Sequence, residues 1–167
     1  MKTENPIPKP ATPLYKKGWF INFLFVLAGV AGVYVLIYVD VVSRAKDAYL
    51  EGEKYLSWYQ NPDLKTQYFQ KQYNEEKAKL DGRLAKKEIS AEEYGEWLDS
   101  LKFDQEFSVA ESPLKYAYQW YKDAYELFTP PESKWVRMAR EKAPQVLIMW
   151  KQELRDKKIP FEDYMFE

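Results

Sequence analysis

Residues 19–39 read WFINFLFVLAGVAGVYVLIYV, an apolar run of 21 residues with no charged side chain and with Asn22 as its only strongly polar one. At ~1.5 Å rise per residue, a helix of this length spans roughly 31 Å, which is close to the thickness of the hydrocarbon core of a bilayer. Buried helices of globular proteins seldom run so long without a charge. The run therefore predicts one transmembrane helix at residues 19–39.

A cleaved secretory signal is the main alternative, because Lys16 and Lys17 provide a basic flank just before the run. Such a signal has an apolar core of only about 7 to 15 residues and ends in a small-x-small cleavage site. Here Tyr34, Tyr38 and Arg44 occupy the exit of the run. We therefore interpret the run as an uncleaved membrane anchor.

Charge is distributed unevenly on the two sides of the anchor. Residues 1–18 carry four lysines and one glutamate, a net charge of +3; since the whole chain has a net charge of −1, residues 40–167 carry −4. The more positive flank of a membrane helix tends to stay in the cytoplasm. We therefore expect the N-terminal side in the cytoplasm and the following domain outside it. That domain would be periplasmic in a bacterial inner membrane, which we favour; a mitochondrial inner membrane is the alternative.

The remaining sequence divides into four segments around the anchor. Residues 1–18 form an arm whose four prolines disfavour helix and favour an extended path. After the anchor, the helical pattern continues as a stalk over residues 40–61, where Asn61-Pro62 stops it. A small all-α extramembrane domain of about four helices is expected at residues 62–159. Residues 160–167 alternate acids with large apolar groups, a pattern that favours a docking segment.

Local start signals place the helices of the domain. Ser90 and Glu93, three residues apart, form a capping box that opens a short helix. Ser112 followed by Pro113 combines an N-cap with proline at the first helical position. The last helix keeps its apolar stripe across Pro144, which predicts one kinked helix. The expected ranges are 63–86, 90–101, 112–128 and 133–157.

The segment LDGRLAKKEISAEEYGEWLDSL, residues 80–101, resembles the SHOCT family of short helical hairpins. In that family a leucine-bearing helix turns through Ile-Ser/Thr-x-Glu-Glu-aromatic into a second helix, and Ile89 to Tyr94 matches this turn. Lys87 stands where the family usually has a glycine. The resemblance covers 22 of 167 residues and implies a role in oligomerisation and packing rather than in catalysis.

The helix expected at residues 112–128 is apolar over most of its circumference. Such a helix needs burial on more than one side. It is either the centre of the domain, which we favour, or is sandwiched between the domain and a partner. The core flank carries Leu114, Ala117, Tyr118, Tyr121, Ala124, Tyr125 and Phe128. The candidate partner-binding residues are Tyr116, Trp120 and Leu127 on the other flank and Phe161, Tyr164 and Phe166 in the docking segment.

The anchor carries small residues at helical spacing, namely Ala28, Gly29 and Gly32. Small side chains on one face let another membrane helix approach closely, which is a main source of helix association in lipid. We expect these three residues to pack against a neighbouring membrane helix.

Composition excludes most catalytic chemistry. With no cysteine and no histidine, the chain lacks disulfides, thiol nucleophiles, the commonest general base, the commonest haem ligand and most zinc ligands. Its six glycines form neither a phosphate-binding loop nor a dinucleotide fingerprint. Basic residues alternate with acidic ones, which is not the pattern of a nucleic-acid-binding surface. We expect no enzymatic activity, and neither a cofactor, a metal, a nucleic acid nor a small-molecule substrate.

These features predict a non-catalytic, single-pass accessory subunit of a larger membrane protein complex, for which an energy-transducing complex is one candidate. Its partners would be other membrane-protein subunits and the lipid bilayer. The alternative is a free-standing anchored adaptor that recruits a soluble protein outside the membrane. The size of the assembly extracted by mild detergent distinguishes the two.

Overall fold

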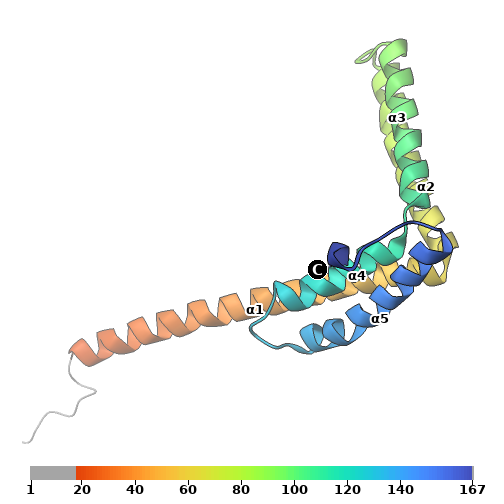
Figure 1. Ribbon diagram of the computed structural model, residues 1–167. Helices are drawn as coiled ribbons and strands as arrows, with labels where there is room; N and C mark the ends of the chain where they lie inside the picture. The colour runs from red at the N-terminus through yellow and green to blue at the C-terminus, as the bar shows by residue number, and fades with distance from the viewer. Residues whose placement is uncertain (1–17, 167) are drawn as a thin grey trace, which may run out of the picture. The chain divides into compact units, whose positions relative to one another are not determined.

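The computed structural model describes residues 18–166, and over this range the fold is all-α with no strand (Figure 1). One long N-terminal helix is followed by four further helices, which confirms the predicted fold class. The helices are α1 (Gly18–Gln60), α2 (Pro62–Ala85), α3 (Ala91–Ala110), α4 (Pro113–Glu126) and α5 (Lys134–Asp156), followed by the short 3-10 helix η2 (Asp163–Phe166). The predicted extended arm lies outside the described residues except for Gly18, which begins α1.

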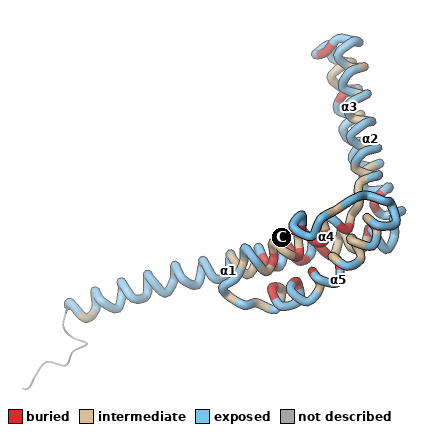
Figure 2. The backbone as a smooth tube through the Cα atoms, viewed as in Figure 1, coloured by how far each residue is buried: buried red, intermediate tan, exposed pale blue. Residues whose placement is uncertain are grey.

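The chain divides into two compact units, with the boundary inside α1 after Val41. In the first unit, α1 is long and apolar enough to cross a membrane, and none of its most apolar stretch is buried by the described chain. Figure 2 shows this part of α1 as exposed over nearly all of its length. A helix whose apolar side chains are exposed all round requires lipid or other helices as its surroundings.

The second unit begins at Val42, so residues 42–60 of the expected stalk form the first helical part of the domain. Ala45, Ala48, Tyr49, Gly52 and Trp58 of α1 are buried there. Small residues at three- and four-residue spacing allow neighbouring helices to approach this face of α1.

The core of the second unit lies between this part of α1, α4 and α5, where the buried residues gather in Figure 2. Five residues of α4 are buried, and all five belong to the predicted core flank: Leu114, Ala117, Tyr118, Tyr121 and Ala124. α4 therefore packs into the core through its predicted core flank. From α5 the core receives Val136, Ala139, Ala143 and Val146, and α5 is one helix that includes Pro144, as predicted.

α2 and α3 pack against each other as a helical hairpin. The predicted capping box is present: Ser90 Oγ accepts from the Glu93 amide at 3.1 Å, and Glu93 Oε2 accepts from the Ser90 amide at 2.8 Å. The prediction of a short helix after Ser90 is wrong, because α3 continues to Ala110. No proline follows Ser90 until Pro113, and Gly95 is tolerated inside the helix.

Two helices end with a lysine in the left-handed backbone conformation. After α2, Lys87 has φ 59°, its amide donates to Leu84 O, and the Glu88 amide donates to Arg83 O, both at 2.9 Å. After α5, Lys158 has φ 54° with the same pattern of hydrogen bonds. This is the Schellman arrangement, in which glycine is the usual residue at the left-handed position.

Candidate functional site

The small-residue face of the anchor is open in the structure. Ala28, Gly29 and Gly32 are exposed, and a methyl group added at either glycine would meet no other part of the described chain within 4 Å. Ala28 and Gly32 are four residues apart, so they lie on the same side of α1. This face can accept a neighbouring membrane helix at close range.

The three candidate residues of α4 lie in different surroundings. Leu127, directly after α4, is 68% exposed, whereas Trp120 is half-buried and packs against the core. Tyr116 is half-buried and stacks on Tyr55 of α1, with ring centroids 5.2 Å apart. Its hydroxyl donates to Glu111 at 2.5 Å, and this bond together with burial raises the pKa of Tyr116 to about 12. Leu127 is therefore the residue of this set that is most available to a partner.

The segment after α5 docks on the chain's own domain. Phe166 is only 7% exposed: its ring meets Trp150 edge-on at 4.9 Å, and its carbonyl accepts from the Tyr118 hydroxyl at 2.8 Å. Phe161 is half-buried beside Phe166, with ring centroids 5.5 Å apart, and Tyr164 is 67% exposed. Phe166 thus fills a place in the domain's own core, and the exposed Tyr164 is the candidate that remains on the surface.

A polar cluster connects the three core helices. Glu53 of α1 accepts from the Tyr121 hydroxyl of α4 at 2.6 Å and pairs with Lys142 of α5. Burial alone would raise the pKa of Glu53, but hydrogen bonds from Lys142, Tyr121 and Tyr49 lower it below the ordinary value of 4.5. Burial and the bond to Glu53 raise the pKa of Tyr121. Because Tyr121 is fully buried, a substrate cannot reach its hydroxyl, and the cluster serves to hold the helices together.

The buried Lys65 connects the two helices of the α2–α3 hairpin through polar contacts. Lys65 is 6% exposed, and its ammonium donates to the carbonyl of Val109 at 3.0 Å and to that of Glu111. These carbonyls belong to the end of α3, where the helix provides no donors of its own. Burial lowers the pKa of Lys65. The cavity beside it, about 140 Å³, is smaller than the pockets that hold small ligands.

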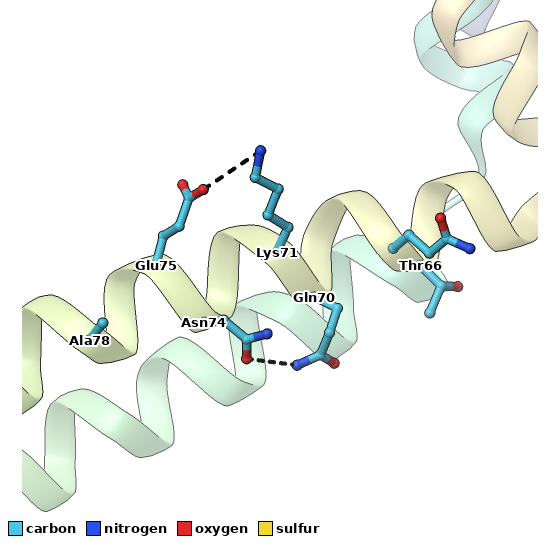
Figure 3. Close-up of a pocket in the computed structure, with 7 residues that line it drawn as sticks. Thr66, Gln70, Lys71, Asn74, Glu75 and Ala78 are labelled. Carbon is cyan, nitrogen blue, oxygen red and sulfur yellow. Dashed lines mark hydrogen bonds and ion pairs between the residues drawn. The ribbon is translucent and has the colours of Figure 1, made fainter.

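A shallow depression runs along one face of α2 (Figure 3). Gln70 donates to Asn74 at 3.1 Å, and Lys71 lies 3.8 Å from Glu75. Amides and an exposed ion pair provide neither an activated nucleophile nor a base held against one.

Within residues 18–166, no three acidic side chains converge as a metal site would require.

Sequence reasoning missed one surface feature, a pair of phenylalanines on α3. Phe103 is 65% exposed and Phe107 is 57% exposed, and their rings stack at 6.2 Å with an angle of 19° between the planes. The range expected for this helix ends at residue 101, so both phenylalanines lie outside it. Their four-residue spacing was the signal that could have identified them.

Comparisons of the chain with family models, with curated proteins and with solved structures found no match in any of the three.

Proposed function

We propose that this chain is a non-catalytic, single-span accessory subunit of a larger membrane protein complex. One observation carries the proposal: α1 leaves its apolar stretch entirely uncovered, while the domain that follows has a complete core of its own. Because no part of the described chain covers the apolar stretch, its surface is available to lipid and to other membrane helices.

Two surfaces support contact with other subunits. In the anchor, Ala28, Gly29 and Gly32 offer a face with little side-chain bulk. On the domain, Leu127 and Tyr164 are large apolar or aromatic side chains left exposed, and Trp120 is partly accessible. Exposed aromatic groups of this kind are enriched where proteins meet.

The orientation is part of the proposal. The net charge of +3 before the anchor and −4 after it favours a cytoplasmic N-terminal side and an extracytoplasmic domain in a bacterial inner membrane. We also infer that residues 80–101, which contain the turn between α2 and α3, are SHOCT-like. Lys87 supports this, because it adopts the left-handed conformation at the position where that family usually has glycine.

Extraction of the protein from membranes in mild detergent, followed by size determination, tests the proposed function. We expect a large co-purifying assembly. Combining Ala28→Leu with Gly32→Leu should weaken the association by on the order of 1 kcal/mol, because added bulk separates the helices. The control combines Val26→Leu with Val30→Leu, which enlarge the opposite face of the same helix and should change little. A monomer or a small homo-oligomer in the unmodified protein would contradict a subunit role and favour the adaptor.

A further inference from the structure

The outward face of α3 exposes two aromatic rings. Gln105 marks the side of α3 that faces α2, because its amide donates to Gln70 Oε1 at 2.8 Å. Phe103 and Phe107 are each two residues away from Gln105, ~200° around the helix, so they lie on the opposite side. Both rings are exposed to water, so burying them against a partner would lower the free energy.

The charge around these rings is predominantly negative, with Lys102 paired to Glu106 at 4.0 Å. α3 contains six acidic residues and one lysine, Lys102, a net charge of −5. Three of the four lysines of α2 pair with acids of α2 itself: Lys71 with Glu75, Lys77 with Asp81, and Lys79 with Glu76. The fourth, Lys65, donates to backbone carbonyls at the end of α3. Within the described chain, Glu92, Glu96, Asp99 and Asp104 form no ion pair.

An open groove follows one flank of the same face. Glu96, Trp97, Ser100 and Asp104 of α3 line it together with Leu80 and Arg83 of α2, and its volume is about 610 Å³. Trp97 is 54% exposed, and the Arg83 guanidinium lies over its ring at 5.4 Å. The groove extends the apolar surface sideways, and three acids, Glu76, Glu96 and Asp104, line it beside two bases, Lys79 and Arg83.

We propose that the outward face of α3, centred on Phe103 and Phe107, binds a basic amphipathic helix of another subunit. Apolar side chains of that helix would cover the two rings, and its lysines and arginines would meet Asp99, Asp104 and Glu106. A second copy of α3 would bring −5 against −5, and an anionic lipid surface would be repelled in the same way. The inference rests on the proposed function, since it requires another subunit, and adds to it a contact in which neither the anchor nor Leu127 and Tyr164 takes part.

Site-specific photo-crosslinking of the full chain in its native membranes tests the proposal. A photo-reactive phenylalanine analogue replaces Phe103, and in a matched control it replaces Ile148, which is 70% exposed on α5. After irradiation, mass spectrometry identifies the attached segment. The result expected is one attached segment of another protein that carries a net positive charge and apolar residues at helical spacing, with no such product from position 148.

Charge reversal separates this contact from incidental proximity. Asp99→Lys combined with Asp104→Lys should lower the crosslink yield at position 103 by at least about tenfold, because like charges would then face each other. Glu126→Lys combined with Glu141→Lys, both on exposed sites elsewhere, should leave the yield unchanged. Phe107→Ala provides a second variant that leaves charge untouched and should also reduce the yield.

Several results would overturn the inference: attachment to lipid, to a second copy or to an acidic segment, a yield no higher than at position 148, or indifference to charge reversal. If a large assembly co-purifies while position 103 captures nothing, this inference fails and the proposed function stands. If no assembly co-purifies, the proposed function fails as well.

Discussion

At the scale of single residues, Gly52 determines how closely α1 and α4 approach within the domain. A Cβ atom at this position would lie 2.7 Å from Cε1 of Tyr121, well inside contact distance. Tyr121 is fully buried and its hydroxyl is held by Glu53, so its ring has little room to move. The close approach of the two helices therefore depends on the missing side chain of Gly52.

We predict that Gly52→Ala lowers the free energy of unfolding of the domain by ~1–3 kcal/mol, the usual effect of overpacking a core. Thermal unfolding of the detergent-solubilised protein, followed by near-ultraviolet circular dichroism of its aromatic residues, measures this. Gly82→Ala is the matched control: no atom lies within 4 Å of its added methyl, and alanine in a helix should stabilise by up to ~1 kcal/mol. Equal effects of the two substitutions would show that Gly52 is not a contact point.

The pairings in the polar cluster around Glu53 could not be predicted from the sequence alone. Its hydrogen bond to Tyr121 joins residues 68 positions apart, and its ion pair with Lys142 joins residues 89 positions apart. Lysine, glutamate and tyrosine are all common in this chain, and no local pattern selects which of them meet. Such pairings follow only from the packing of the helices that bring them together.

At the scale of secondary-structure elements, the starts of the helices were predictable because they depend on neighbouring residues. Three serines lie where the structure begins a helix, and the side chain of each accepts a hydrogen bond from a free amide of the first turn. They are Ser90, which is followed by Glu93, Ser112, which is followed by Pro113, and Ser133. The exposed face of α3 was not predictable in the same way. Which face of a helix is covered depends on which helix packs alongside it, and α2 covers the side of α3 that carries Gln105.

We predict that Lys87→Gly stabilises the hairpin by on the order of 0.5–1 kcal/mol, because a side chain in the left-handed region is strained and glycine is not. The same unfolding measurement applies. The control is Lys86→Gly: Lys86 has an ordinary φ of −79°, so glycine there only adds disorder to the unfolded chain and should destabilise. A loss of stability in Lys87→Gly would argue that the lysine side chain, rather than the backbone, holds the turn.

At the scale of the whole molecule, the two units differ in whether their apolar side chains are buried by the chain itself. The domain has its own core, from α1 through Phe166, whereas the first part of α1 has none. Hydropathy alone predicted this division, since an uncharged run of 21 residues is readable without knowledge of the fold. The boundary was less predictable: small residues in α1 beyond Val41 bring that stretch into the domain instead of leaving it a stalk.

The central claim is that residues 19–39 span a membrane and hold the domain on the outer side. The chain has no cysteine, so a single introduced cysteine reports its own location without background. We would replace Thr12 or the exposed Ala78 by cysteine and treat intact cells with a membrane-impermeant maleimide. The account predicts labelling of Ala78→Cys in intact cells and of Thr12→Cys only after permeabilisation. Labelling of both positions in intact cells would contradict a spanning helix, and labelling of Thr12→Cys alone would contradict the orientation.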